Sequence, residues 1–138
     1  MTDSARQGTV RDWMTREPAA VSDDCPIRTA LARMRAAVIR HLLVLEDDRL
    51  VGILSTRDLG RLLADGPPDA RLAEPVRTIM TEAPVAVGPD TPVTVAARAL
   101  LDAKIGALPV RDEERIVGIF TTADALDALL AIVEAPVG

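Results

Sequence analysis

The sequence predicts a mixed α/β protein built from two copies of one β-α-β-β-α unit. Shifting the 138-residue chain by 66 positions aligns 10–64 with 76–130 without a gap, and 21 of the 55 aligned residues are identical. In each copy, short apolar runs alternate with stretches in which apolar residues recur every three or four positions. Short apolar runs are typical of buried strands, and recurrence every three or four positions is typical of helices. One copy would leave a face of its small sheet bare, so we expect the two repeats to pack sheet to sheet.

The first half of each copy predicts a strand followed by a helix. Short helical stretches end at Met14 and Met80, which we expect to pack in the core. Apolar runs at 19–21 and 85–87 are typical of short strands. Proline then favours the first turn of a helix, where a missing amide N–H is harmless. Helical spacing follows Pro26 at Ile27, Ala30, Leu31, Met34 and Val38, and follows Pro92 at Val93, Ala96, Ala97 and Leu100.

The second half of each copy predicts a hairpin and a final helix. Apolar runs at 42–45 and 50–54 flank the acidic turn 46–48, and 108–110 and 116–120 flank 112–114. The closing helices are expected at 57–64 and 123–133. The domain boundaries that follow are 8–64 for the first repeat and 76–133 for the second. The stretch 65–75, rich in Pro, Gly and charge, reads as a linker.

The composition excludes several classes of function. The net charge of −5 and the pI near 4.8 oppose binding to a phosphate backbone, and 1% aromatic residues cannot build a base-stacking platform. One cysteine and one histidine argue against a disulfide, a zinc site and a nucleophile–base pair, so we expect neither a metal centre nor an enzyme. The polar N-terminus and the lack of a long apolar run indicate a soluble cytoplasmic protein without a membrane span.

The repeated motifs resemble tandem cystathionine-β-synthase (CBS) domains, whose pair is called a Bateman module. The resemblance covers roughly residues 8–133. It includes Met14-Thr15 and Met80-Thr81, each followed by a proline, and the second-strand segments 40–44 and 106–110. Gly52-Ile53-Leu54-Ser55-Thr56-Arg57-Asp58 and Gly118-Ile119-Phe120-Thr121-Thr122-Ala123-Asp124 match the family's glycine–(Ser/Thr)–x–x–Asp signature. Leu43 departs from the pattern, because the family usually has proline there, as the second copy does at Pro109.

The resemblance implies a sensor that holds an adenosine-containing ligand in the clefts between the copies. AMP, ADP, ATP, S-adenosylmethionine and NAD are the expected ligands, and a homodimer is the expected assembly. One ionised carboxylate can accept both hydroxyls of a ribose, which assigns Asp58 and Asp124 to the sugar. Hydroxyls at the start of the following helix suit the ribose or a phosphate: Ser55, Thr56, Thr121 and Thr122.

Cations and apolar residues complete the predicted site. Arg40, His41 and Arg57 are candidate phosphate contacts in copy one, and Lys104 and Arg111 in copy two. The apolar slot for adenine is assigned to Ala20 and Val21 or Ala86 and Val87, with Ile53 or Ile119. Leu108 and Pro109, in the second-strand motif, are further candidate ligand contacts. Because the cations of copy one correspond to Gly106, Ala107 and Ala123, we expect phosphate-rich ligands to favour the cleft that carries them.

Two other interpretations stay open. Ser-x-x-Asp and Thr-x-x-Asp before an apolar helix are also N-capping patterns, which are compatible with ligand binding. The chain could instead be a structural dimerisation module without a ligand, since 125–133 is apolar nearly all round. We expect a module of this length to carry no attached enzyme, channel or DNA-binding domain, and therefore to act by associating with an unknown protein partner.

Overall fold

The computed structural model describes residues 8–66, 69–82 and 85–136. They divide into two compact units, which are described separately below. The first unit holds 19–66 and 69–82, and the second holds 8–18 and 85–136. Each unit therefore contains most of one sequence repeat together with the opening segment of the other. None of the helices in the described residues is long and apolar enough to cross a membrane.

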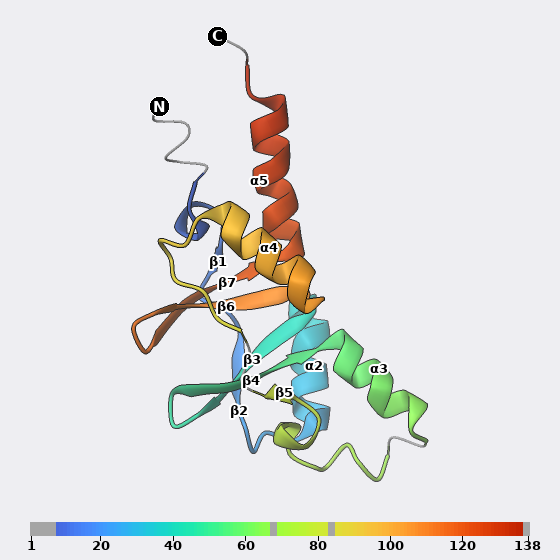
Figure 1. Ribbon diagram of the computed structural model, residues 1–138. Coiled ribbons are helices and arrows are strands. Elements are labelled where there is room, and N and C mark those ends of the chain that lie inside the picture. The colour runs from blue at the N-terminus through green and yellow to red at the C-terminus, as the bar shows by residue number, and fades with distance from the viewer. Residues whose placement is uncertain (1–7, 67–68, 83–84, 137–138) are drawn as a thin grey trace. The chain divides into compact units, whose positions relative to one another are not determined.

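The first unit is a four-stranded sheet with two helices packed on one face (Figure 1). The strand order is β2-β3-β4-β5, with β2 parallel to β3 and the other neighbours antiparallel. Along the chain the elements are β2 (Ala20–Ser22), α2 (Ile27–Ala37), β3 (His41–Glu46), β4 (Arg49–Ser55), α3 (Thr56–Ala64), η2 (Val76–Thr78) and β5 (Thr81–Glu82).

The second unit repeats this order with one strand fewer. Its elements are η1 (Val10–Asp12), β1 (Thr15–Arg16), α4 (Val93–Ala103), β6 (Ala107–Asp112), β7 (Arg115–Thr121) and α5 (Thr122–Glu134), and the sheet order is β1-β7-β6. The predicted strand at 85–87 is wrong, since Val87 forms only an isolated bridge with Val110. In the first unit the amide of Asp23 extends the ladder by donating to Leu45. The corresponding residue is Pro89, which has no N–H to donate.

Most of the apolar residues that recur at helical spacing form the cores. Val38 is an exception, because it follows the end of α2 and is 89% exposed. Ile27, Ala30 and Met34 on α2 pack with Leu42, Val44 and Leu54 of the sheet. In the second unit the core comprises Val10, Val93, Ala96, Leu100, Leu108, Val110, Phe120 and Ala128. Met80 and Met14 pack against the first and second core respectively, as predicted.

The two ends of the long helices α2 and α4 have special backbone geometry. Pro26 and Pro92 were expected in the first turn, but they are the N-caps, so each helix begins at the residue after its proline. The next amides bond outside the helix, Ile27 N to Glu74 O at 2.9 Å and Val93 N to Gly8 O at 2.7 Å. At the other end the chain turns through a left-handed residue, Val38 (φ 53°) or Lys104 (φ 56°).

Each sheet gains an edge strand from the opening segment of the other repeat. β5 pairs with β4, where Glu82 faces Gly52, and β1 pairs with β7, where Arg16 faces Gly118. A Cβ atom on Gly118 would lie 2.7 Å from Met14 Sδ and 2.8 Å from the carbonyl oxygen of Thr15. A Cβ on Gly52 would similarly clash with Met80 and would lie 2.9 Å from the carbonyl oxygen of Thr81. Glycine is therefore needed in both units for the methionine segment to approach the sheet.

Candidate functional site

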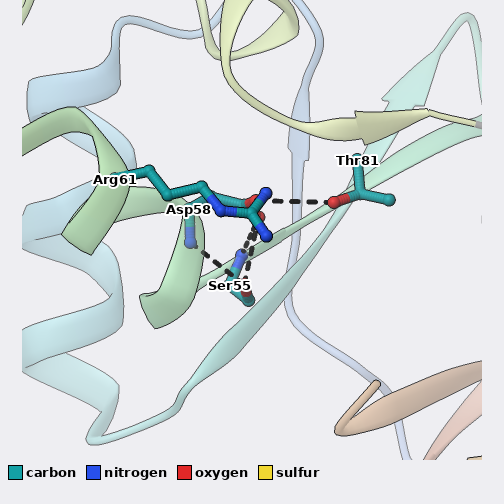
Figure 2. Close-up of polar contacts among 4 residues, drawn as sticks. All are labelled: Ser55, Asp58, Arg61 and Thr81. Atoms are coloured by element: carbon teal, nitrogen blue, oxygen red, sulfur yellow. Dashed lines mark hydrogen bonds and ion pairs between the residues drawn. The ribbon is translucent and has the colours of Figure 1, made fainter. Parts of the chain in front are cut away.

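The junction between β4 and α3 holds a capping box. Ser55 ends the strand and caps the helix, and Asp58 is the third residue of α3. The Asp58 amide donates to Ser55 Oγ at 3.3 Å, and Asp58 Oδ2 accepts from Ser55 N at 2.8 Å and from Ser55 Oγ at 3.0 Å (Figure 2). The N-capping interpretation of the Ser-x-x-Asp pattern is thus confirmed.

The junction between β7 and α5 has the same geometry. Asp124 Oδ2 accepts from Thr121 N at 2.9 Å and from Thr121 Oγ1 at 3.1 Å, and the Asp124 amide donates to Thr121 Oγ1 at 3.2 Å. The duplication therefore preserves the arrangement of atoms as well as the residue types.

A threonine from the edge strand completes each junction. Thr81 Oγ1 donates to Asp58 Oδ1 at 3.4 Å (Figure 2), and Thr15 Oγ1 lies 3.5 Å from both oxygens of Asp124. The sequence prediction did not include these two threonines among the site residues. The available signal was the Met-Thr pair at 14–15 and 80–81, which is identical in the two copies.

Both carboxylates are buried rather than turned toward solvent. The exposed fraction is 5% for Asp58 and 9% for Asp124. Arg61, on the next turn of α3 and itself 71% exposed, places its Nη1 3.9 Å from Asp58 Oδ1 (Figure 2). A carboxylate has about four acceptor sites, so each aspartate keeps acceptor capacity beyond its protein partners. This arrangement can bind hydroxyl donors at a helix start.

The first junction also gathers the predicted cations. His41 pairs with Ser55 across β3 and β4, and the Thr56 amide donates to the Arg40 carbonyl at 3.1 Å. Burial lowers the pKa of His41, the charge of Asp58 opposes this shift, and Arg40 and Arg57 reinforce it. His41, Asp58, Arg40 and Arg57, all four of them predicted site residues, therefore interact electrostatically around this junction.

A hollow of about 340 Å³ lies beside this junction, between the end of α2 and the start of α3. Arg40 and Thr56 are in its lining, together with apolar residues such as Leu31, Met34 and Leu59. Arg40 thus borders the helix side of the sheet. His41, the next residue along the strand, points to the opposite face.

The second junction has no equivalent of these cations. Ala107 pairs with Thr121, and the Gly106 carbonyl accepts from the Thr122 amide at 3.1 Å. Burial raises the pKa of Asp124. The hydrogen bonds from Thr121 and Thr15 oppose this shift, and the charge of Asp127 adds to it.

Strand parity separates the predicted apolar contacts into two groups. Val21 and Leu108 belong to the helix-side cores, and Val87 packs against the second core. Their side chains are correspondingly not available on the opposite sheet face, which corrects their assignment as ligand contacts. Ala20 aligns with Leu43, Ile53 and Thr81 across the first sheet, and Pro109 aligns with Ile119 and Thr15 across the second. These two cross-strand rows lie on the sheet face opposite the helices, next to the junctions, and Ala86 lies beside the second row.

Two further predicted cations take different positions. Lys104 lies at the end of α4, two residues before Gly106. Arg111 lies near the hairpin end of β6, whereas the junction is at the Ala107 end. At about 3.3 Å per residue, this separation is roughly 13 Å, so Arg111 does not belong to the junction. Among the described residues, no group of three or more His, Cys, Asp or Glu side chains could hold a metal ion.

Comparison with known proteins agrees with this duplicated architecture. The family model of the CBS domain matches residues 10–65 and again 76–131. The chain belongs to the CBS domain family. Its mixed α/β fold and its tandem CBS repeats are therefore confirmed.

Two curated relatives show how the CBS pair occurs in other proteins. A CBS domain-containing protein of Dictyostelium discoideum is 32% identical over 136 residues, which cover 91% of this chain and 93% of the relative. The magnesium transporter MgtE of Thermus thermophilus is 39% identical over 125 residues, which cover 86% of this chain but only 26% of the transporter. The CBS pair thus matches nearly all of one relative and about a quarter of the other.

Two solved structures of CBS proteins contain bound ligands. CBSX2 in complex with AMP has a TM-score of 0.76 and 29% identity, covering 91% of this chain and 98% of that one. A CBS domain pair in complex with 5′-methylthioadenosine and S-adenosyl-L-methionine has a TM-score of 0.78 and 26% identity, covering 91% and 98%. These CBS proteins bind adenosine-containing small molecules.

Proposed function

We propose that this CBS pair is a regulatory module, without catalytic activity, that binds adenosine-containing ligands through Asp58 and Asp124. The candidates are AMP, ADP, ATP, S-adenosylmethionine and NAD. The observation that carries the proposal is the pair of buried carboxylates at equivalent strand-to-helix junctions, each held by two hydroxyl-bearing side chains. A cap alone needs the Ser55 or Thr121 hydroxyl, whereas the edge-strand threonine adds a second donor, Thr81 to Oδ1 of Asp58 and Thr15 to the two oxygens of Asp124.

The ligands of the two solved relatives support the choice of chemistry. AMP, 5′-methylthioadenosine and S-adenosyl-L-methionine share an adenine and a ribose but differ at the 5′ position. A ribose offers two neighbouring hydroxyl donors, for which an ionised carboxylate is a matched acceptor. The apolar rows beside each junction, Ala20 with Ile53 and Ala86 with Ile119, suit the flat and weakly polar adenine.

The test is isothermal titration with AMP and 2′-deoxy-AMP, which differ by one of the two hydroxyls. Charge-assisted hydrogen bonds contribute about 1.5–3 kcal/mol, so Asp58→Asn and Asp124→Asn should each weaken AMP binding at their own repeat by about 10- to 150-fold. Wild type should prefer AMP over 2′-deoxy-AMP, and this preference should fall in the asparagine variants.

Two control variants separate binding from capping. Ser55→Ala removes the cap and should lower the free energy of unfolding by about 1 kcal/mol, and because the carboxylate remains, it should weaken AMP binding less than Asp58→Asn does. Asp65→Asn changes an exposed carboxylate at the end of α3 and should alter neither quantity. Equal AMP affinity in Asp58→Asn, Asp124→Asn and Asp65→Asn would contradict the proposal, and so would the absence of any binding heat.

The outer surface of α5 favours a second function, homodimerisation. Leu126, Leu130 and Val133 recur at helical spacing and are all exposed, as are Leu129 and Ile132. We propose that this stripe meets the same stripe of a second copy. In sedimentation measurements, Leu130→Glu should shift the assembly to monomer, whereas Leu63→Glu on exposed α3 should not. A monomeric wild type at all concentrations would contradict this assembly.

A further inference from the structure

The two repeats carry opposite charge at equivalent junctions. Position 61 is Arg in the first repeat and its counterpart at position 127 is Asp. Arg40, His41 and Arg57 likewise correspond to Gly106, Ala107 and Ala123. Arg57 and Arg61 with Asp58 give a formal charge of +1 at the first junction, whereas Ala123 and Asp127 with Asp124 give −2 at the second.

The charge at position 61 or 127 lies close to the carboxylate of its own unit, whereas Arg40 borders the helix side of the first sheet. Arg61 Nη1 is 3.9 Å from Asp58 Oδ1, and Arg40 and Arg57 both act electrostatically on His41, which pairs with Ser55. In the second unit, Asp127 acts electrostatically on the buried Asp124 from the next turn of α5. The two buried carboxylates therefore have neighbours of opposite charge, Arg61 beside Asp58 and Asp127 beside Asp124.

The charged residues of the two edge strands do not cancel the difference. Arg16 and Glu82 follow Thr15 and Thr81 in the edge strands, and successive side chains of a strand point to opposite faces. They consequently face away from the side on which the threonines meet the aspartates.

We infer that the two repeats select different adenosine ligands by the charge of the 5′ substituent. The first repeat takes a 5′-phosphorylated adenosine, because the arginines compensate Asp58 and leave a surplus of positive charge. The second takes an adenosine with an uncharged or cationic 5′ group, because two carboxylates repel a phosphate. This inference rests on the proposed function, since both repeats must first bind the ribose.

The probes that test it are AMP and 5′-methylthioadenosine, which share adenine and the ribose diol but differ by about two charges at the 5′ position. Titrations of Asp124→Asn report mainly on the first repeat, and titrations of Asp58→Asn report mainly on the second. The ratio of AMP affinity to 5′-methylthioadenosine affinity should be at least about 100-fold higher for the first repeat. Binding of AMP should weaken with added salt, whereas binding of 5′-methylthioadenosine should not.

Charge-exchange variants give an independent readout, because they alter exposed side chains and keep both aspartates. Arg61→Asp should lower AMP affinity at the first repeat about tenfold or more and leave 5′-methylthioadenosine affinity unchanged. Asp127→Arg should raise AMP affinity at the second repeat by a similar factor. The matched control is Arg49→Asp, which changes the charge equally but lies at the hairpin end of β4, about 20 Å along the strand from Ser55.

The outcomes distinguish the two levels of the proposal. Equal affinity ratios in the two repeats, or an Arg61→Asp effect no larger than that of Arg49→Asp, would overturn the charge selection while the binding function stands. Absence of binding of either probe to wild type would overturn the binding function and the inference together.

Discussion

Gly118 gives the sharpest test of how the fold positions the candidate site. In Gly118→Ala, the new methyl group would lie 2.7 Å from Met14 Sδ and 2.8 Å from the carbonyl oxygen of Thr15. Side-chain carbons do not approach neighbouring atoms this closely, so β1 must move. Overpacking of this kind costs about 1–3 kcal/mol. For a chain of this size, that is a fall in melting temperature of roughly 4–12 °C.

The assay is thermal unfolding followed by circular dichroism, with Gly60→Ala as the matched control. Gly60 lies within α3, and a Cβ there would meet nothing within 4 Å. Alanine is favoured over glycine in a helix by about 1 kcal/mol, so this control should melt a few degrees higher than wild type. Opposite signs for the two substitutions are the expected result.

A second substitution locates the clash. Met14→Ala in the Gly118→Ala background should recover part of the lost stability, because the sulfur contact is removed while the contact with the Thr15 carbonyl remains. Gly52→Ala should behave like Gly118→Ala in its own unit. If both glycine variants melt at or above the wild-type temperature, the reasoning about the edge strands is refuted.

Three other predictions concern strain and protonation, and each is measured by unfolding. Val38→Gly should raise the free energy of unfolding by about 1 kcal/mol or more, because a β-branched residue is strained at φ 53°, and Lys104→Gly should gain less. Burial raises the pKa of Asp124, so its favourable contribution is complete below the unfolded pKa and is lost as pH rises through the folded pKa. Asp124→Asn should therefore gain stability relative to wild type as the pH rises from about 3 to 7, and a constant difference would contradict this. Burial lowers the pKa of His41, so wild type should lose stability on acidification below about pH 6.5, and His41→Ala should lack this loss.

Local patterns predicted the elements of the fold well. The hairpins at 41–55 and 107–121 follow from alternating apolar runs around acidic turns, and α2 from the spacing of Ile27, Ala30 and Met34. The failure at 85–87 has a cause in two prolines. Pro89 and Pro109 stand where Asp23 and Leu43 donate backbone hydrogen bonds to the ladder of the first unit, and neither proline has an N–H, so the apolar run alone overstated the strand.

The candidate site was predicted in part. Asp58, Ser55 and their counterparts were identified because a cap is written within four consecutive residues. The orientation of Val21 and Leu108 was missed, since which face of a strand is covered by helices depends on packing. Thr81 was missed as a partner of Asp58 for a related reason. It is 23 residues away and reaches the aspartate only because β5 joins the sheet beside β4.

By itself, the amino-acid order determined the duplication, the succession of strands and helices, the two capping boxes and the unequal distribution of cations. All of these depend on residues that are neighbours in the chain or stand 66 positions apart in matching copies. Tertiary structure alone decided that each opening segment joins the sheet of the opposite repeat, which brings Thr15 to Asp124 across 109 residues. The physical reason is that backbone hydrogen bonds between distant strands are available to almost any residue, so the choice of partner depends on close packing such as that of Met14 over Gly118.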